Sequence, residues 1–338
     1  MGKVLILTDG KAGHENQSKA FARALGCEFD LVEVHFKSKF HKALSYLFDC
    51  CGIRTLAFYT VKIETTGNAE NTKRLCDLCV LCGFHRYSGV IGTGSGTFYA
   101  AKAMARKLGV RCGVVLYPRG YDIASFDCVL APAFDRPKAA ANVVEIPANL
   151  VANDEAFYAK GIEDFKAHYG KCSNSGMFEC SNAVAVIVGG PNKCSTMTPE
   201  WMKAQLDAIF AQRNRTIEQS NNLEFWVTTS RRTPPAVEQV VDSYPWDYKL
   251  LYSKDHFNPI PAFVKLAKKL YVTAESTGML SESCTFGTAE VVALDNLKPG
   301  PHKFRRFVED LRKAGYVDGN KKVDLSTQFA RAKALMGL

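Results

Sequence analysis

Short apolar runs alternate along the chain with longer segments in which apolar residues recur at every third or fourth position. The short runs are typical of buried strands, and the longer segments have the period of amphipathic helices. The expected strands are residues 3–7, 29–36, 89–91, 110–117, 127–131, 143–146, 183–188, 223–229 and 270–273, and helices are expected over residues 18–25, 258–268, 303–314 and 326–336. Strands that alternate with helices form parallel sheets covered by helices, so the pattern predicts an α/β fold.

The pattern changes near the middle of the chain. The 338 residues exceed one typical hydrophobic core, so two domains are expected. Residues 153–181 are largely polar, and the Ser-, Asn- and Gly-rich stretch 171–176 resembles a linker. We therefore expect a first domain over residues 1–175 and a second over residues 176–320.

Basic residues outnumber acidic residues by 43 to 34, which gives a formal net charge of +9 spread along the chain. This balance favours acidic ligands or an anionic membrane surface. No nucleic-acid-binding motif is recognisable, so a nucleic acid partner is not expected. No apolar run reaches the length of a membrane span, and the N-terminal run is too short for a signal peptide. The sequence therefore predicts a cytoplasmic protein.

Three of the twelve cysteines, Cys76, Cys79 and Cys82, have the spacing that begins an iron–sulfur motif. That motif needs a fourth cysteine where this chain has Arg86. His85 offers a fourth ligand for zinc, but the spacing is cramped for the usual paired arrangement. We expect instead that the cysteines are reduced and mostly buried, and that no metal is bound.

Residues 271–294 place a strand, a tight turn, a helix and a second strand in quick succession. The helix start leaves backbone N–H groups unpaired at the positive end of the helix dipole, which suits an anion. Gly278 lets a ligand approach the backbone, and Ser276 and Thr277 either cap the helix or bind a phosphate oxygen. Glu282 either accepts hydrogen bonds from two ribose hydroxyls or is a solvated surface carboxylate.

Two adjacent arginines, Arg231 and Arg232, follow the strand at 223–229 and precede a proline that starts a helix. Burying two guanidinium groups without a partner is costly, and a diphosphate binds such groups in bidentate fashion. The pair is therefore either a diphosphate site or a solvated pair. Gly190 and Asn192 lie in the loop after the strand at 183–188. This loop follows the first strand of the second domain, just as residues 9–14 follow the first strand of the first domain.

A polar, glycine-bearing loop follows the first strand, at the carboxyl end where open α/β sheets bind ligands. His14 is the side chain of this loop that can take up a proton near neutral pH without help. In the alternative interpretation Asp9 and Asn16 are turn and capping residues and His14 is solvated. The glycine string at 92–96 lacks the spacing of a dinucleotide fingerprint, so no cofactor is expected, but its helix start can hold an acceptor or a sugar.

Residues 36–59 are basic and aromatic together. Such a segment can lie on anionic lipid, with its rings at headgroup depth and its lysines near phosphates. It can equally be a helix packed on the sheet whose lysines extend into solvent.

Six ordered motifs together resemble the mitochondrial-fission "elongated mitochondria" family, and they span nearly the whole chain. The motifs are Thr8-Asp9-Gly10-Lys11-x-Gly13-His14-x-Asn16-Gln17, Gly189-Gly190-Pro191-Asn192-Lys193, Thr229-Ser230-Arg231-Arg232-Thr233-Pro234, Asn258-Pro259, Val272-Thr273-Ala274-Glu275-Ser276-x-x-Met279-x-Ser281-Glu282 and Lys303-Phe304-Arg305-Arg306-Phe307. The chain departs from the family at Ala133, where a histidine is expected. Glu275 also stands where aspartate is commoner.

The bacterial members of this family are regarded as glycosyltransferases of the GT-B fold. The resemblance therefore implies two Rossmann-like domains facing across a cleft, with a nucleotide-sugar donor on the C-terminal domain. It also implies that the last helix, in residues 321–338, returns to the N-terminal domain. The first loop is similar to that of the lipid-linked glucosaminyltransferase of peptidoglycan synthesis, which makes His14 the candidate base.

The sequence thus predicts transfer of a sugar from a nucleoside-diphosphate sugar to a glycan or lipid-linked acceptor. No D-x-D motif is present, so we expect a metal-independent reaction, in the cytoplasm or on the inner face of the membrane. The position of His14 in the first loop leads us to expect inversion, with His14 as the base. Asp9 and His14 are the catalytic candidates. The donor-side candidates are Gly190, Asn192, Ser230, Arg231, Arg232, Thr233, Glu275, Ser276, Thr277, Gly278, Met279, Ser281 and Glu282. The acceptor-side candidates are Gly10, Gly13, Asn16, Gln17, Gly94, Ser95, Gly96 and Arg119. The alternatives are a non-catalytic adaptor of the same fold and a nucleotide-sugar epimerase.

Overall fold

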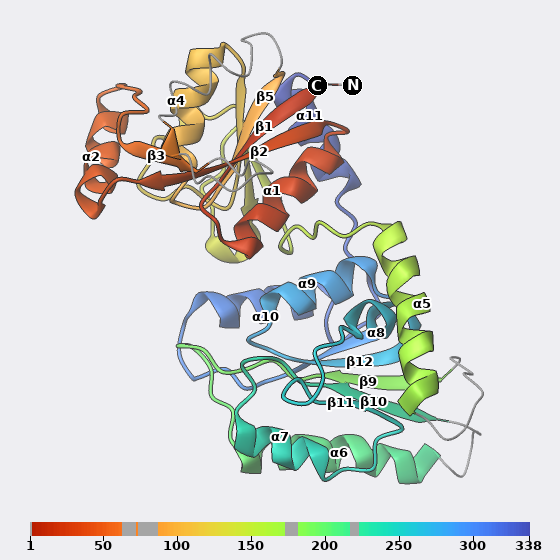
Figure 1. Cartoon of the computed structure of the whole chain (residues 1–338). Coiled ribbons are helices and arrows are strands. Elements are labelled where there is room, and N and C mark those ends of the chain that lie inside the picture. The colour runs from red at the N-terminus through yellow and green to blue at the C-terminus, as the bar shows by residue number, and fades with distance from the viewer. Residues whose placement is uncertain (1, 63–71, 74–86, 173–181, 217–222) are drawn as a thin grey trace. The chain divides into compact units, whose positions relative to one another are not determined.

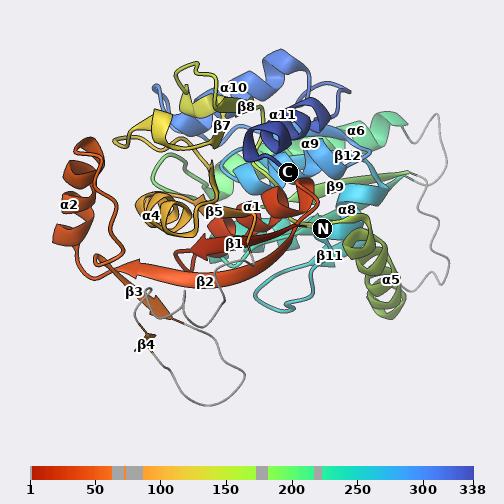
Figure 2. The ribbon, with the colours of Figure 1, turned by 90° about the horizontal axis from the view of Figure 1, so that it is seen from above.

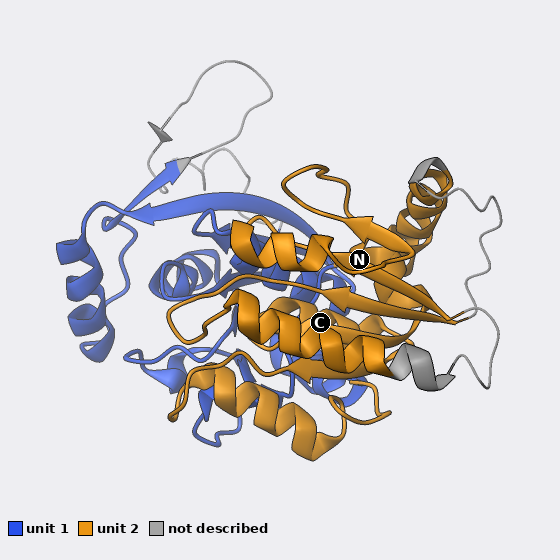
Figure 3. Ribbon diagram, turned by 90° about the horizontal axis from the view of Figure 1, so that it is seen from below, with its two compact units in different colours: residues 1–152, 324–338 blue, residues 153–323 orange. Residues whose placement is uncertain are grey.

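The computed structural model describes residues 2–62, 72–73, 87–172, 182–216 and 223–338 (Figure 1). The chain forms two compact units. Unit 1 contains residues 1–152 and 324–338, and unit 2 contains residues 153–323 (Figure 3). Each unit is a mainly parallel sheet with helices packed on it, which confirms the predicted α/β class.

Unit 1 is built on a sheet of order β4-β3-β2-β1-β5-β6-β7-β8. Its strands are β1 Lys3–Thr8, β2 Glu28–Phe36, β3 Tyr59–Lys62, β4 Thr72–Lys73, β5 Gly89–Thr93, β6 Arg111–Val115, β7 Cys128–Pro132 and β8 Val143–Ile146. At one edge of the sheet the pairs β2–β3 and β3–β4 are antiparallel. The other strand pairs are parallel. Every residue of β5 is buried, because helices cover both faces of a parallel sheet.

Four α-helices lie in the described part of unit 1. They are α1 Ala12–Ala24, α2 Lys39–Cys50, α4 Phe98–Leu108 and α11 Ser326–Met336. A side chain at Gly113 would meet both Phe21 and Met336, so α1 and α11 share one face of the sheet. α2 lies beyond the end of β2, at the periphery of the unit (Figure 2). The position of α11 confirms that the C-terminal helix returns to the N-terminal unit.

Unit 2 is built on a wholly parallel sheet of order β11-β10-β9-β12-β13. Its strands are β9 Ala183–Ile187, β10 Glu224–Thr228, β11 Tyr248–Leu250, β12 Ala267–Thr273 and β13 Glu290–Leu294. Its helices are α5 Glu155–Cys172, α6 Pro199–Thr216, α7 Pro235–Asp242, α8 Ile260–Leu266, α9 Thr277–Phe286 and α10 Lys303–Ala314. This strand order is that of a Rossmann-like half, in which the chain winds outward from β9 in both directions.

The predicted domain boundary near residue 175 is wrong, because α5 belongs to unit 2. The Phe165 ring packs against those of Trp226 and Phe263. Gly161 lies so close to α8 that a Cβ there would be 2.4 Å from the Cβ of Pro261. The chain therefore leaves unit 1 at residue 152. The expected linker at 171–176 begins within the last turn of α5, and its residues 173–176 lie outside the described residues.

Two predicted helix boundaries are also wrong. α1 begins at Ala12 rather than near residue 18, so the polar loop after β1 is shorter than expected and His14 lies in the first turn of the helix. α8 ends at Leu266, and Ala267 already pairs with β9 as the first residue of β12. The other two helices named above, at 303–314 and 326–336, agree with the structure.

The cysteines that the structure describes are free, and four of them, Cys27, Cys112, Cys128 and Cys284, are buried. Burial raises the pKa of the Cys284 thiol to about 12, which keeps it protonated as expected of an inert core cysteine. The cysteine run at 76–82 lies outside the described residues. Within the described ranges, every helix is too short or too polar to cross a membrane.

Candidate functional site

The strand order of each sheet reverses at one strand. In unit 1, β1 lies between β2 and β5, and in unit 2, β9 lies between β10 and β12. Ligands of open α/β sheets bind outside the carboxyl ends of the strands at such switch points. The predicted site residues other than Arg119 come after β1 or β5 in unit 1 and after β9, β10 or β12 in unit 2. Each unit therefore contains its own candidate site.

In the unit 1 site, His14 and Asp9 form a hydrogen-bonded pair. His14 Nδ1 lies 2.9 Å from Asp9 Oδ1, and Lys11 Nζ donates to Asp9 Oδ2 at 2.7 Å. Burial of the Asp9 carboxyl raises its pKa, but the hydrogen bonds from His14 and Lys11 outweigh that effect and hold the pKa well below the usual range. An ionised carboxylate can only accept, so Nδ1 carries the hydrogen and Nε2 keeps a free lone pair. This is the arrangement of a positioned general base.

The glycine string after β5 packs directly against this pair. A Cβ at Gly94 would lie 2.4 Å from His14 Cε1, and a Cβ at Gly96 would lie 2.9 Å from Asp9 Cβ. Gly94 also has a φ of +82°, which favours glycine. The Ser18 and Thr93 hydroxyls, 2.6 Å apart, join α1 to the end of β5. The structure thus brings the first loop and the glycine string together into one surface.

Asp9 does not cap α1, because Lys11 is the N-cap residue and no side chain caps the helix. Gly10 has a φ of +74° and lies against Glu33, whereas Gly13 is exposed and has open space where a Cβ would stand. Asn16 is exposed on the second turn. Gln17 Oε1 is buried and has no hydrogen-bond partner among the described residues.

Two acceptor-side candidates are bound to other elements of unit 1. Ser95 Oγ accepts a hydrogen bond from Lys42 Nζ of α2 at 2.9 Å. Arg119 follows β6, and its guanidinium donates to the carbonyl of Asp135 and lies over the Tyr117 ring. Within the part of the chain that the structure describes, Arg119 makes no contact with His14, so its acceptor role stays a prediction.

In the unit 2 site, a chain of hydrogen bonds runs along the carboxyl edge of the sheet. Thr233 Oγ1 donates to the Gly189 carbonyl at 2.6 Å, and the Gly189 N–H donates to Thr273 Oγ1 at 2.9 Å. The Thr273 hydroxyl donates to Glu275 Oε1 at 3.0 Å, and Asn296 Nδ2 donates to Glu275 Oε2 at 2.7 Å. The loops after β10, β9, β12 and β13 are therefore fixed to one another.

Gly189 and Gly190 allow this close packing. A Cβ at Gly189 would lie 2.2 Å from Glu275 Oε1, and a Cβ at Gly190 would lie 2.3 Å from the backbone oxygen of Arg232. The clash at Gly190 involves backbone atoms, so the movement of a side-chain tip cannot relieve it. Sequence reasoning chose Gly190 but missed Gly189, Thr273 and Asn296, although the double glycine was itself a signal of close backbone approach.

Burial raises the pKa of the Glu275 carboxyl, and its hydrogen bonds with Asn296 and Thr273 oppose that rise only in part. The side chain is 3% exposed. Glu275 therefore holds loops together in the floor of the site rather than offering a free carboxylate to a ligand.

Arg231 and Arg232 are exposed, so they bear no cost of burial, and both interpretations of the pair stay open. Neither guanidinium makes an ion pair or a hydrogen bond within the described residues. Ser230 and Thr233 organise their turn, because Thr233 Oγ1 accepts from the Ser230 N–H at 2.9 Å. Two guanidinium groups are therefore available at the carboxyl end of β10. They can be solvated or can bind an anion.

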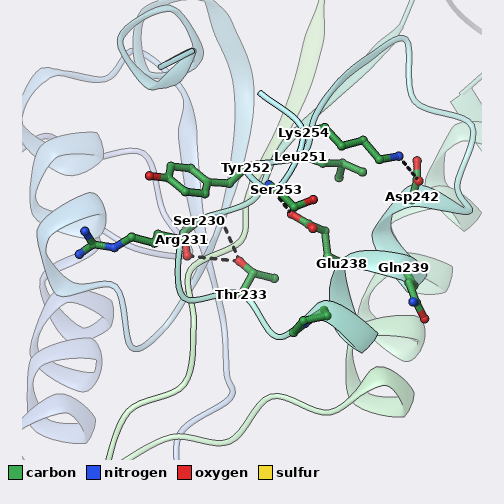
Figure 4. A pocket seen from close by; sticks show the side chains of 11 residues that line it. Ser230, Arg231, Thr233, Glu238, Gln239, Asp242, Leu251, Tyr252, Ser253 and Lys254 are labelled. Carbon is green, nitrogen blue, oxygen red and sulfur yellow. Dashed lines mark hydrogen bonds and ion pairs between the residues drawn. The ribbon is translucent and has the colours of Figure 1, made fainter. Parts of the chain in front are cut away.

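A cavity of about 450 Å³ lies beside this turn, between α7 and residues 251–254 (Figure 4). Its wall contains Glu238, which the sequence did not single out. Glu238 is 9% exposed, and its Oε1 accepts from the Thr229 hydroxyl at 2.5 Å. In Figure 4 the Arg231 side chain extends away from Glu238.

The start of α9 is open. Ser276 is the N-cap residue but makes no capping hydrogen bond, and open space surrounds the position of a Cβ at Gly278. Thr277 and Met279 are partly exposed in the same turn. Ser281 is buried, and its hydroxyl donates to the Thr277 carbonyl within α9 at 2.7 Å. Asn192 Oδ1 accepts from the Cys194 N–H in its own loop.

Glu282 is buried rather than solvated, with 6% of its surface exposed. Its Oε1 accepts hydrogen bonds from Tyr158 at 2.8 Å and from Asn153 at 2.9 Å. Burial raises the pKa of its carboxyl, and these two hydrogen bonds oppose the rise. Glu282 therefore links α9 to the start of α5, and its Oε2 makes no hydrogen bond to the described residues.

A family model described as Mitochondrial fission ELM1 matches residues 12–330 of the chain. A comparison with curated proteins found no match. Among solved structures, the chain is similar to UDP-GlcNAc 2-epimerase from Neisseria meningitidis bound to UDP-GlcNAc, with a TM-score of 0.51, 11% identity and coverage of 99% of this chain and 98% of the other.

Two glycosyltransferase structures are also similar. MurG from Acinetobacter baumannii has a TM-score of 0.44 and 14% identity over 99% of this chain and 92% of its own. A UDP-glucosyltransferase from Polygonum tinctorium has a TM-score of 0.46 and 10% identity over the same shares, 99% and 92%. At 11% identity the likeness to the epimerase concerns the fold alone, and the predicted α/β fold with two Rossmann-like sheets is confirmed.

Proposed function

The chain belongs to the mitochondrial fission ELM1 family, and we propose that it transfers a glycosyl group from a nucleoside-diphosphate sugar to an acceptor. The observation that carries the proposal is the cationic edge of the unit 2 sheet. Two unpaired guanidinium groups follow β10, and the uncapped start of α9 follows β12. The intervening loop after β9 contacts the turns that precede or carry these groups, because Gly190 lies against the Arg232 backbone and Gly189 lies against the Glu275 side chain.

This edge suits a leaving diphosphate. When the bond between the anomeric carbon and the diphosphate breaks, negative charge builds on the departing oxygen. Fixed positive groups that meet this charge stabilise the transition state more than the ground state. We assign Arg231, Arg232 and the N–H groups at 277–279 to that role, with no divalent metal.

In unit 1, His14 Nε2 is proposed to take the proton of an acceptor hydroxyl. The hydroxyl oxygen then bonds to the anomeric carbon from the face opposite the diphosphate, which inverts the anomeric configuration. The acceptor class we propose is a glycan or a lipid-linked sugar. This step is supported by the free lone pair that Asp9 leaves on Nε2.

Two alternatives remain open to experiment. The first is a nucleotide-sugar epimerase, like the similar structure from Neisseria meningitidis. An epimerase would convert the sugar of the nucleotide without an acceptor. A non-catalytic adaptor would keep the fold without binding a donor. The unpaired arginines favour a nucleotide ligand over the adaptor.

Binding of the donor is tested by thermal denaturation with uridine, guanosine, adenosine and cytidine diphosphates and their sugars. We expect one base series to raise the Tm, because a ligand that binds only the folded state stabilises it. The double variant Arg231→Ala/Arg232→Ala should weaken that ligand by about tenfold to a hundredfold, since charge-assisted hydrogen bonds contribute ~1.5–3 kcal/mol. Lys203→Ala, which removes an exposed cation from α6, is the matched control. No stabilisation by any nucleotide would support the adaptor.

A second prediction concerns Glu282. Glu282→Gln should weaken donor binding, because a ribose hydroxyl loses a charged acceptor, while the Tm stays nearly unchanged. A glutamine oxygen can still accept from Tyr158 and Asn153. By contrast, Glu282→Ala leaves both donors buried and unpaired, which should cost about 1–3 kcal/mol of the free energy of unfolding.

Calorimetric titration of the donor and chemical denaturation of both variants separate the two roles of Glu282. If Glu282→Gln binds the donor as tightly as the parent protein does, Glu282 only links α9 to α5 and is no ribose ligand.

A further inference from the structure

The outward side of α2 is apolar. Phe40 is 67% exposed and Leu47 is 58% exposed, and Ile53 just beyond the helix is 46% exposed. These are the most exposed large apolar side chains within the described residues. At helical spacing they form one stripe with two smaller exposed residues, and we call this stripe the α2 outer face: Phe40, Ala43, Leu47, Cys50 and Ile53.

The opposite side of α2 is fixed to the body of unit 1. Leu44, Tyr46 and Phe48 pack against the hydrophobic core, and the Tyr46 ring stacks on Tyr121 at 4.4 Å. Asp49 is 2% exposed and is paired with Lys102 of α4. The helix therefore cannot rotate to bury its outer face without breaking these contacts.

Only positive charge surrounds the α2 outer face on its own segment. Lys37 and Lys39 are exposed at the start of the helix. Asp49 is the one acidic residue of the segment 37–54, and it is buried. From the neighbouring helix α4, Arg106 reaches the carbonyl of Gly52 at 3.3 Å. A surface whose apolar side chains protrude, and whose exposed charges on the same segment are all cationic, complements the anionic headgroups and apolar interior of a lipid layer.

We propose that the α2 outer face docks unit 1 on an anionic lipid surface, with Phe40, Leu47 and Ile53 inserted at headgroup depth and Lys37 and Lys39 beside lipid phosphates. Amphipathic helices of this kind bind through buried apolar area together with attraction to anionic headgroups. This inference does not rest on the proposed glycosyl transfer, because none of these residues belongs to the unit 1 or unit 2 site. It makes a water-soluble enzyme competent for an acceptor that is held in a membrane.

The test is co-sedimentation of the full chain with vesicles of phosphatidylcholine, with and without phosphatidylglycerol. We expect binding to the anionic vesicles and a loss of that binding as salt is raised. The double variant Phe40→Ser/Leu47→Ser should bind at least about tenfold more weakly, because two inserted apolar side chains are lost. Lys37→Glu/Lys39→Glu should weaken binding by a similar factor through repulsion from the anionic surface.

Two control variants remove exposed apolar side chains elsewhere. Leu31→Ser on β2 and Phe157→Ser on α5, which are 39% and 40% exposed in the parent protein, should leave vesicle binding unchanged. Circular dichroism checks that each variant is folded. The proposal is overturned if the parent chain ignores anionic vesicles, or if Phe40→Ser/Leu47→Ser binds them as the parent does. It is also overturned if the outer face proves to bury itself against a second copy, which light scattering would show as a dimer that this variant abolishes.

Discussion

Replacing His14 with alanine is expected to lower turnover by about a hundredfold to ten-thousandfold, the range that a positioned general base contributes. The reason is the hydrogen-bond geometry of the unit 1 site. Asp9 accepts the Nδ1 hydrogen at 2.9 Å and stays ionised, so Nε2 is the nitrogen that takes a proton. The effect should fall on kcat, whereas the affinity for the donor, which we assign to unit 2, should not change.

The measurement is the release of nucleoside diphosphate at saturating donor, using the donor that raises the Tm. His35→Ala is a matched control, because His35 lies on β2 of the same unit and also pairs with a carboxylate, Glu33, at 2.7 Å. Asp9→Asn should lower kcat as well, since an amide can present its N–H to Nδ1 and reverse the tautomer. Near-full turnover of His14→Ala at saturating donor would falsify the proposed base.

The apolar pattern along the chain was sufficient to predict most of the strands. β5 and the inner strands of both sheets are buried on two faces, and a continuous apolar run is a direct consequence of that position. The start of α1 could not be found in the same way. Residues 12–17 carry no large apolar side chain and none of them is fully buried, so the apolar periodicity of the helix begins only after them.

The domain boundary was missed for a related reason. α5 is polar over most of its surface, which resembles a linker, yet its aromatic residues Tyr158, Phe165 and Tyr169 are buried on one side. Their spacing, seven and then four residues, is a helical stripe that the sequence does display. Giving more weight to these three large rings than to the overall polarity would have assigned the helix to unit 2.

The candidate site was predictable only as a set of loops. The ordered motifs predicted chemistry in the loops after β1, β9, β10 and β12, and the glycine string predicted a binding role for the loop after β5. The sheet topology places these loops at two switch points. The sequence could not show that Glu275 and Glu282 would be buried and already hydrogen-bonded. Those contacts join residues far apart in the chain, and no local pattern of residues encodes which donor meets which acceptor.

The buried ion pair of unit 1 is the clearest case of such a hidden contact. Lys102 Nζ lies 2.9 and 3.0 Å from the two carboxylate oxygens of Asp49, and Arg54 lies 3.1 Å from one of them. Lys102 is 3% exposed and Asp49 is 2% exposed. The Asp122 N–H also donates to this carboxylate at 2.7 Å, so α2, α4 and the loop after β6 meet at one group.

Asp49→Ala is therefore expected to reduce the free energy of unfolding by about 3–5 kcal/mol, the cost of leaving one partner of a buried pair uncompensated. Asp164→Ala removes a carboxylate from the exposed pair with Lys160 and should cost no more than about 1 kcal/mol. Urea denaturation of both variants at neutral pH measures the difference. A loss for Asp49→Ala as small as that for Asp164→Ala would show that water replaces the missing carboxylate.

The pH dependence of the same variant identifies the cause of the loss. Burial lowers the pKa of Lys102, and its hydrogen bond with Asp49 partly opposes that effect. Without Asp49 the folded-state pKa should fall further below the unfolded value, which is about 10.4 for lysine. Between those two pKa values the unfolded chain binds more protons, so the stability of Asp49→Ala should rise with pH over that interval. In the parent protein Lys102 keeps its partner, so the free energy of unfolding should rise less over the same alkaline range. Equal slopes of this free energy against pH in the two proteins would mean that Asp49→Ala loses stability through packing rather than through the unpaired ammonium.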